Sequence, residues 1–419
     1  MHRGETPDVK KKGCRAVVKK ALGDIRVLDV THWWAGPTSA MLMADMGAEV
    51  IKVERPGGGE GQRSPDVHGP GLQGENLVFL FLNRNKKSIT LDLKNPKGHD
   101  IFMKLARMSD VVVENFAPGV MKRLGLGYDA LSEANPRIIM VSISGFGQYG
   151  PSSERPAYDP VIQAMSGLMS VTGFPDNPPV RCGNVIADYL GGIFGFCGAV
   201  TALYAREKTG EGQWVDVALM DATTLTLGDR IVRYAAVKEP QLIAQWGNTI
   251  PFVGGMTPYY HTRDGYFSFR ATGEDSVVKL AEMIGAHESV RLDEAEAEQD
   301  LTYHLLGQLD APLREYFSGK TTAEAVEVLE TVGIQAVPVR SLAEVMNDPQ
   351  FIARDMLVEV EHPRLGKVKL PGVVPKLSKT PGSVETPGPM LGAHNEEVYC
   401  GLLGLDREEL ARLEDEKVV

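Results

Sequence analysis

The spacing of apolar and polar positions predicts alternating strands and helices over the first 150 residues. Short apolar runs that are typical of strands occur at residues 25–30, 49–54, 88–93, 110–114 and 137–144. Helical spacing fills residues 37–46 and 95–108 between them. Strands that alternate with helices favour a mostly parallel sheet, so we expect an α/β fold.

The pattern becomes less regular after residue 150. Helical spacing over Tyr158–Thr172 is followed by a predicted strand at 213–219 and another helix from Asp221. From about Pro240 a smaller α+β domain is predicted, with a strand at 259–269 that contains an Asp-Gly turn, and helices near 276–284, 303–317 and 322–331. A Pro- and Gly-rich connection, 371–389, then leads to a helix-rich tail that we expect to return to the first domain.

One apolar segment, Arg181–Gly198, combines a carboxylate with a row of glycines. Gly191, Gly195 and Gly198 recur at helical spacing after Asp188, which indicates a helix that another backbone approaches closely. Asp188 has two interpretations from the residues alone. It is either an N-cap that accepts the first N–H groups of the helix, or a nucleophile placed at the helix N-terminus.

Composition and charge exclude several classes of protein. The 419 residues carry a formal net charge of -11, which argues against a nucleic-acid-binding protein. The four cysteines and nine histidines are scattered, so we expect no disulfide framework and no metal site, and the cysteine usage fits the cytoplasm. The uncharged run 189–205 falls short of the roughly 20 apolar residues of a membrane span, so a core helix is expected there and no membrane association.

Chemistry-bearing side chains follow the predicted strands, at the edge where parallel sheets bind ligands. They are Trp34 and Ala35 after the first strand, Arg55 after the second, Lys94 after the third, and Asn115, Phe116 and Arg123 after the fourth. Each cation alone is typical of a solvated surface charge, but the set suits a phosphate-bearing, adenine-containing ligand. The G-x-G-x-x-G at 145–150 is followed by turn residues rather than a helix, so it does not indicate NAD binding.

Several longer segments resemble the family III coenzyme A transferases, the CaiB/BaiF group. This group includes formyl-CoA and carnitine CoA transferases and, as relatives, 2-methylacyl-CoA racemases. The resembling segments are spread over residues 22–405 and include IRVLDVTHWWAGP, ADMGAEVIKVERP, DVVVENFAPGVMKRLGLGYD and TGEGQWVDVALMDA. The resemblance implies a Rossmann-like large domain, a smaller α+β domain, and two chains interlocked in a homodimer. The expected limits are 1–21 for a flexible basic extension, 22–238 for the first part of the large domain, 239–350 for the small domain, 351–390 for a linker and 391–419 for the C-terminal return.

The resemblance also assigns site residues. The family's catalytic aspartate falls on Asp188, and acyl-CoA is implied as a substrate without any prosthetic group. The positions that the family uses around CoA fall on Trp34, Ala35, Arg55, Leu91, Lys94, Asn115, Phe116, Arg123 and Tyr158. Trp34 and the pair Gly254-Gly255 depart from formyl-CoA transferase-like members, which argues against oxalate and formyl-CoA as substrates.

Transfer and racemisation remain two alternatives. Racemases pair the aspartate with a histidine that would fall on Tyr158, and a tyrosine is a poor base at neutral pH. Transfer of CoA from an acyl-CoA to a carboxylic acid, through an aspartyl anhydride and an aspartyl-CoA thioester on Asp188, is therefore favoured. A 2-methylacyl-CoA racemase-type isomerase and a non-catalytic acyl-CoA-binding protein are the alternatives. We expect the N–H groups that open the Gly-rich helix to help stabilise the oxyanion. The loop 248–260, His32, Arg181 and Tyr260 are candidates for acid recognition.

Overall fold

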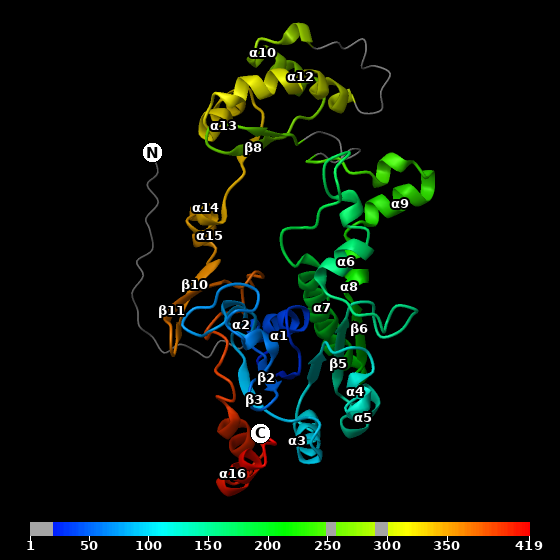
Figure 1. Ribbon diagram of the computed structural model, residues 1–419, viewed down its shortest axis with the longest axis vertical. Helices are drawn as coiled ribbons and strands as arrows, with labels where there is room; N and C mark the ends of the chain where they lie inside the picture. The colour runs from blue at the N-terminus through cyan, green and yellow to red at the C-terminus, as the bar shows by residue number, and fades with distance from the viewer. Residues whose placement is uncertain (1–19, 249–256, 290–300) are drawn as a thin grey trace. The chain divides into compact units, whose positions relative to one another are not determined.

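A computed structural model describes residues 20–248, 257–289 and 301–419 of the chain (Figure 1). The chain divides into two compact units. Unit 1 comprises the described residues up to Ser144 with Gly191–Val217 and Asp355–Val419, and unit 2 comprises Gly145–Leu190 and Ala218–Arg354. Residues 145–190 and 218–238 therefore group with unit 2, whereas the sequence assigned them to the large domain.

A six-stranded sheet forms the centre of unit 1, and it confirms the predicted α/β class. Its order is β3-β2-β1-β4-β5-β6, and all the pairings among β1 to β5 are parallel. This is the strand order of the doubly wound Rossmann fold, in which the direction of the order reverses between β1 and β4. The strands are β1 (Arg26–Asp29), β2 (Glu49–Glu54), β3 (Lys87–Thr90), β4 (Val111–Glu114), β5 (Ile139–Ser144) and β6 (Trp214–Ala218).

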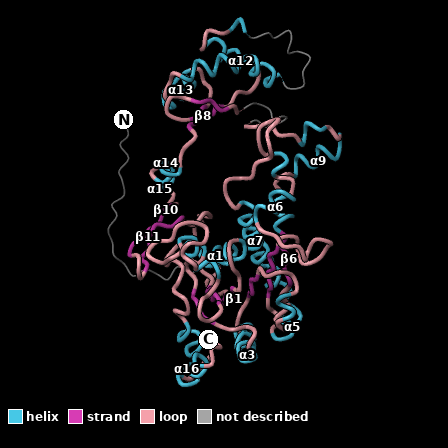
Figure 2. The backbone as a smooth tube through the Cα atoms, in the orientation of Figure 1, coloured by secondary structure: helices cyan, strands magenta, loops and turns pink. Residues whose placement is uncertain are grey.

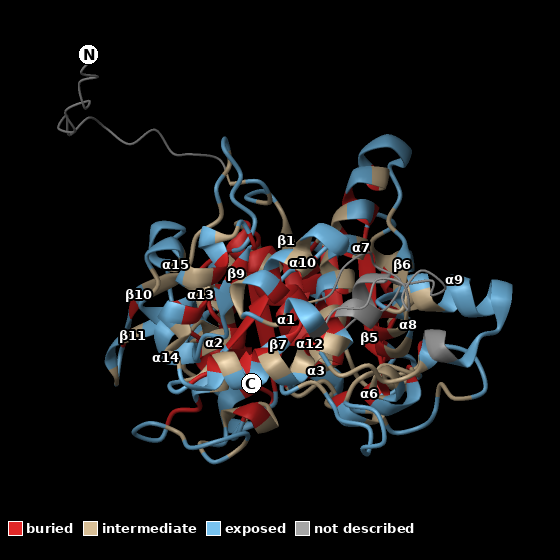
Figure 3. Ribbon diagram, turned by 90° about the horizontal axis from the view of Figure 1, so that it is seen from above, coloured by how far each residue is buried: buried red, intermediate tan, exposed pale blue. Residues whose placement is uncertain are grey.

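Both faces of this sheet are buried along β1 to β5, which explains the apolar runs of these strands, whereas β6 is partly exposed (Figure 3). On one face Leu28, Ile51 and Val112 pack in a core cluster with residues of α3, α4 and α5. The helices of unit 1 are α1 (Ala35–Asp45), α2 (Leu77–Leu82), α3 (Pro96–Arg107), α4 (Val120–Arg123), α5 (Tyr128–Ala134), most of α7 (Ile186–Thr209) and α16 (Arg407–Asp415).

The C-terminal segment packs against this same sheet. Tyr399, in the π-helical turn Glu397–Leu402, and Leu410 of α16 lie in the core cluster with Ile89. The segment expected to be a linker contains a hairpin of β10 (Leu357–His362) and β11 (Gly366–Pro371) (Figure 2). Each strand is short and has one polar face, so its alternating pattern is weak. For this reason the Pro- and Gly-rich sequence around it was interpreted as a linker.

Unit 2 contains a three-stranded antiparallel sheet and most of the remaining helices. The strands β7 (Tyr259–His261), β8 (Tyr266–Phe269) and β9 (Ala336–Pro338) pair in that order, with an apolar cluster shared by α10, α12 and α13. The helices are α6 (Asp159–Met165), α8 (Leu219–Leu225), α9 (Gly228–Val237), α10 (Glu274–Met283), α12 (Leu301–Ser318), α13 (Thr322–Thr331), α14 (Leu342–Met346) and α15 (Pro349–Ala353).

Residues 158–172 do not form the single helix that their spacing predicted. Helix α6 ends at Met165, and the chain turns at Gly167, whose φ is +89°. Glycine adopts this left-handed conformation readily and commonly follows the last turn of a helix. Gly167 therefore ends the helix rather than lying inside it.

The glycines of α7 allow close packing: Gly195 belongs to the row that the spacing predicted, whereas Gly192 lies beside that row. A Cβ on Gly192 would lie 2.6 Å from the Cβ of Thr38 and 2.7 Å from the carbonyl oxygen of Ala35, both in α1. Gly195 likewise adjoins Ile143. α7 is the one described helix that is long and apolar enough to cross a membrane, and 39% of its apolar window is buried within the structure. These contacts fit the expected core helix.

Replacement of Gly192 by alanine tests this packing. A new methyl group must displace α1, so we expect Gly192→Ala to lower the free energy of unfolding by about 1–3 kcal/mol. Gly307→Ala in α12 is the matched control, because nothing lies within 4 Å of its Cβ position. That variant should be neutral or stabilised by about 0.5–1 kcal/mol, the usual gain of Gly→Ala inside a helix. Equal thermal denaturation midpoints for the two variants would show that the close approach is not required.

Candidate functional site

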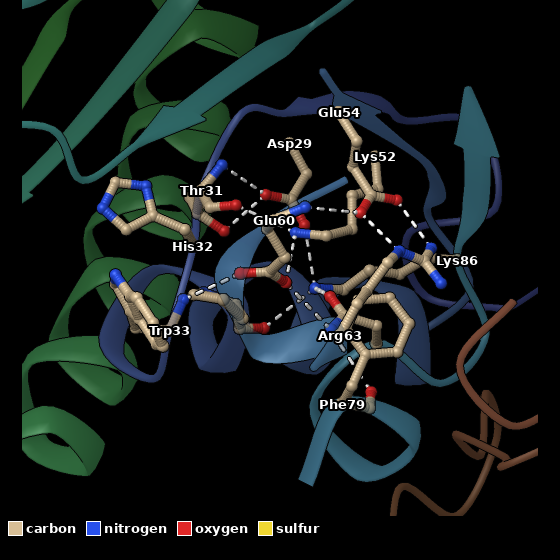
Figure 4. A network of polar contacts seen from close by, with 12 residues as sticks. Asp29, Thr31, His32, Trp33, Lys52, Glu54, Glu60, Arg63, Phe79 and Lys86 are labelled. Carbon is tan, nitrogen blue, oxygen red and sulfur yellow. Dashed lines mark hydrogen bonds and ion pairs between the residues drawn. The ribbon is translucent and has the colours of Figure 1, made fainter. Parts of the chain in front are cut away.

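A buried ion cluster is formed by residues of β1 and β2, of the chain after β2 and by the residue that precedes β3 (Figure 4). The strand register aligns Asp29 with Lys52 and Lys52 with Ser88. Three ion pairs join the cluster: Lys86–Asp29 at 2.8 Å, Lys52–Glu60 at 3.0 Å and Arg63–Glu54 at 2.6 Å. Each buried charge of these pairs is compensated by an opposite charge. The loss of one partner would leave a buried charge uncompensated, which is strongly destabilising.

The charges of the cluster also set the pKa values of its members. Burial acts to lower the pKa of Lys52, but Asp29, Glu60 and Glu54 outweigh it and the pKa is raised. Burial lowers the pKa of Lys86 to about 8. Burial and the nearby Lys52 charge lower the pKa of His32 to about 4, so this imidazole is neutral at physiological pH.

The cluster holds the loop between β1 and α1 in one conformation. The Lys52 ammonium donates to the Thr31 carbonyl oxygen at 2.9 Å. The Asn115 side chain accepts from the His32 N–H at 2.9 Å and donates to the His32 carbonyl oxygen at 2.8 Å. The Trp33 N–H donates to Glu60 at 2.9 Å. Successive residues of the loop are therefore fixed by side chains from other elements.

Eight of the nine residues assigned to CoA binding lie in unit 1, where they follow the parallel strands. Because parallel strands end at the same edge of a sheet, these residues share one edge. They are Trp34 and Ala35 after β1, Arg55 after β2, Leu91 and Lys94 after β3, Asn115 and Phe116 after β4, and Arg123 at the end of α4. The ninth, Tyr158, lies in unit 2.

The members of this set differ in what they present to a ligand. Arg55, Lys94 and Arg123 are exposed, and within the described part of the chain no carboxylate pairs with them. Phe116 lies beside His32, with ring centroids 5.3 Å apart. The Leu91 side chain is buried in the core cluster, so only its backbone is available to a ligand. The three exposed cations are suited to phosphate groups.

The start of α7 is held by a residue that the sequence did not single out. The Asp159 carboxylate, which is buried, accepts from the N–H groups of Ala187 at 2.8 Å and Asp188 at 3.4 Å. Asp188 is the third residue of the helix, so the N-cap interpretation of Asp188 is wrong. The expectation that the opening N–H groups bind an oxyanion is also corrected, because Asp159 already occupies two of them.

Asp159 is itself fixed by Gln163, one turn later on α6. The Gln163 amide donates to Asp159 at 2.6 Å and to the Asn184 carbonyl oxygen at 3.2 Å, and its own oxygen accepts from the Cys182 N–H at 2.8 Å. The sequence signal for this pair was an Asp and a Gln four residues apart on one helix face. Nothing local in the sequence indicates that they reach residues 182–188.

The Asp188 carboxylate has an unusual environment. Among the described residues, no hydrogen-bond donor and no cation contacts it. Burial and the neighbouring Asp159 charge raise its pKa to about 7. A raised pKa in a carboxylate without partners is typical of functional sites. At neutral pH a large fraction of this group is ionised and poorly solvated, which favours nucleophilic attack.

The remaining candidates separate into three groups. The Tyr260 side chain is buried, stacks on Phe269 and donates to Asp310, so it belongs to the small-sheet core rather than to an acid-binding site. Tyr158 and Arg181 are exposed. Gly254-Gly255 and most of the loop 248–260 lie outside the described residues.

Comparisons with known proteins agree with these features. Residues 22–395 match the family model described as CoA-transferase family III. The succinyl-CoA–D-citramalate CoA-transferase of Chloroflexus aurantiacus is 37% identical over 96% of this chain and 98% of that protein. The acetyl-CoA:oxalate CoA-transferase of Acetobacter aceti is 40% identical over 86% of this chain and 90% of that protein. A solved CaiB/BaiF family structure from Brucella suis has a TM-score of 0.79 and 30% identity, and the match covers 91% of this chain and 99% of that one.

The raised pKa of Asp188 predicts that the free energy of unfolding depends on pH. Below the ordinary aspartate pKa of 3.8 both folded and unfolded chains hold the proton. Between that value and about 7 only the unfolded chain releases it, so the stability falls as the pH rises through this window. We expect Asp188→Asn to raise the thermal denaturation midpoint more at pH 8 than at pH 5.

The control for this measurement is Asp176→Asn. Asp176 is exposed in the same unit and has a left-handed φ of +62°, which asparagine tolerates. Its substitution should leave both midpoints unchanged. An equal gain from Asp188→Asn at the two pH values would contradict the raised pKa.

Proposed function

The chain belongs to CoA-transferase family III, and we propose that it moves coenzyme A from an acyl-CoA donor to a carboxylic acid acceptor through covalent intermediates on Asp188. The observation that carries the proposal is the partly buried Asp188 carboxylate, which has no hydrogen-bond or ionic partner among the described residues. A carboxylate is a weak nucleophile in water, and removal of its solvation makes it more reactive.

The proposed reaction needs no group other than the two substrates. An Asp188 oxygen attacks the thioester carbonyl, the C–S bond breaks, and CoA leaves as a thiolate from a mixed aspartyl anhydride. The thiolate then attacks the aspartyl carbonyl, which gives an aspartyl-CoA thioester and releases the donor acid. The acceptor carboxylate attacks this thioester, and the thiolate attacks the acceptor acyl carbon of the second anhydride. The products are a new acyl-CoA and free Asp188.

Coenzyme A is proposed to bind at the strand edge of unit 1. The exposed cations Arg55, Lys94 and Arg123 would pair with its phosphates, and Asn115 and Phe116 follow the neighbouring strand β4. The backbone N–H groups of Ala35 and Gly36 open α1, whose N-cap residue makes no side-chain capping bond. Since Asp159 occupies two of the opening N–H groups of α7, those two groups are not proposed for oxyanion stabilisation.

An isomerase remains the second candidate that the sequence raised. It requires a base opposite Asp188, and the position that would supply a histidine holds Tyr158. The charged group that faces Asp188 among the described residues is Asp159, whose carboxylate already accepts hydrogen bonds from Ala187, Asp188 and Gln163. These features favour transfer. Uptake of deuterium at the α-carbon of a branched acyl-CoA, without any acceptor acid, would favour the isomerase.

We expect Asp188→Ala to abolish CoA exchange and all covalent adducts while CoA still binds. Wild-type protein incubated with acetyl-CoA or succinyl-CoA should gain mass on the peptide that contains Asp188, and mass spectrometry of the digest detects the adduct. Asp176→Asn is the control, because this exposed acid should retain full exchange and the adduct. Near-normal turnover by Asp188→Ala would contradict the mechanism.

The interlocked homodimer also remains a proposal, as does a cytoplasmic location. Helix α9 has no buried residue, and its Ile231, Val232 and Val237 side chains are exposed apolar groups that a second copy would cover. Light scattering should give twice the chain mass of 45.6 kDa, and Val232→Glu should weaken the association. A monomer in the wild-type protein would contradict the dimer.

A further inference from the structure

Gln163 is a polar side chain in a fully buried position. None of its surface is exposed, and its neighbour on α6, Ile162, is also fully buried. Burial of an amide costs free energy unless its polar atoms find partners. An apolar side chain of the same size would fill this position without that cost. The amide therefore indicates that its particular contacts matter.

The contacts of Gln163 join two segments that both lead to Asp188. Its nitrogen donates to Asp159 at 2.6 Å and to the Asn184 carbonyl oxygen at 3.2 Å. Its oxygen accepts from the Cys182 N–H at 2.8 Å. Asp159 lies one turn earlier on α6, and residues 182–184 directly precede α7. All of these residues belong to unit 2, so one side chain connects the entry to α7 with the carboxylate that holds its first turn.

The same contact acts on the charge of Asp159. A donor to a carboxylate favours the charged form of that carboxylate. Burial and the Asp159 charge together raise the pKa of Asp188 to about 7. The hydrogen bond from Gln163 to Asp159 is therefore linked to the ionisation of Asp188, although it acts only through Asp159.

The other charges around Asp188 have a smaller part in its ionisation. Asp159 is the one charge that contributes to the shift of Asp188 among the described residues. On α7 itself, residues 189–205 carry no charged side chain. The remaining titratable groups of the adjoining segments are exposed or half-buried: Tyr158, Arg181, Cys182, Tyr189, and Asp221 of α8, the helix that packs against α6.

We propose that Gln163 is a positioning residue for the covalent chemistry, which fixes both the place of Asp188 and the ease with which it is ionised. The inference rests on the proposed function, in which Asp188 is the nucleophile. Gln163 touches neither substrate nor Asp188. It holds Asp159 on the backbone of α7 and holds the chain that enters this helix.

Replacement of Gln163 by methionine removes the amide and keeps the length of the side chain. Asp159 then loses a donor that favours its charge, so Asp188 should ionise at lower pH. With acetyl-CoA or succinyl-CoA as donor, we expect the rate of adduct formation on Asp188 to fall at least about tenfold, because the nucleophile is displaced. The acid limb of the pH–rate profile should move to lower pH by about half a unit. The Kd of CoA should not change, because CoA is proposed to bind on unit 1.

Two further variants separate this role from a folding defect. Thr223→Val removes another fully buried polar group of unit 2, whose hydroxyl donates to the Leu219 carbonyl oxygen at 2.8 Å. It should lower stability without moving the acid limb. Gln163→Asn keeps a buried amide that is one methylene too short for all three contacts. It should shift the limb in the same direction as Gln163→Met, and it remains available if the methionine variant folds poorly.

A stability measurement tests the contact without any activity. Asp188→Asn should raise the thermal denaturation midpoint more at pH 8 than at pH 5, and this difference should be smaller in the Gln163→Met background. The reason is that an Asp188 carboxylate that ionises more readily costs less stability at pH 8. An equal difference in the two backgrounds would show that Gln163 does not affect Asp188.

The possible results separate the inference from the proposed function. An unchanged acid limb in a folded Gln163 variant, or an equal shift in Thr223→Val, overturns the inference, while an adduct on wild-type Asp188 leaves the proposed function standing. If the wild-type protein forms no adduct on Asp188, the proposed function fails, and the role of Gln163 in the chemistry fails with it.

Discussion

The candidate site depends on a buried set of charges that is stable only when complete. Lys52 and Lys86 are fully buried, and the carboxylates that neutralise them come from β1 and from the chain after β2. Removing one partner would leave an uncompensated buried charge, which costs far more than the pair contributes. The cluster thus fixes the path of the β1–α1 loop, and through that loop it fixes the first turn of α1.

Asp188, the proposed nucleophile, differs from this cluster because its carboxylate has no counter-charge among the described residues. Asp159 accepts hydrogen bonds from the backbone of α7, and its charge adds to burial in raising the pKa of Asp188. The helix start is therefore stabilised at the expense of the side chain that is proposed to react. A side chain whose environment lowers stability is expected at functional sites, where activity requires a group in an unfavourable environment.

The sequence predicted those parts of the structure that depend on neighbours along the chain. The β/α alternation gave strand limits within about two residues for β1 and β2, and the glycine spacing indicated the close packing at Gly195 but not the contact of Gly192 with α1. The stop at Gly167 was missed because glycine is compatible with a helix until its φ is known. Asp159 and the Lys52–Glu60 pair were missed because their partners are brought together only by the tertiary fold.

The β1–α1 loop and the start of α7 are held by different side chains. Asp188 depends on Asp159 and Gln163, whereas Trp33 depends on Glu60 and the ion cluster. A change in the loop that carries Trp33 therefore need not disturb the nucleophile. Relatives that are 34–40% identical are named for acids as different as oxalate, malate and glutarate, which is the divergence that such a division allows. In this chain the contacts that fix the β1–α1 loop are thus separate from the contacts that fix the first turn of α7.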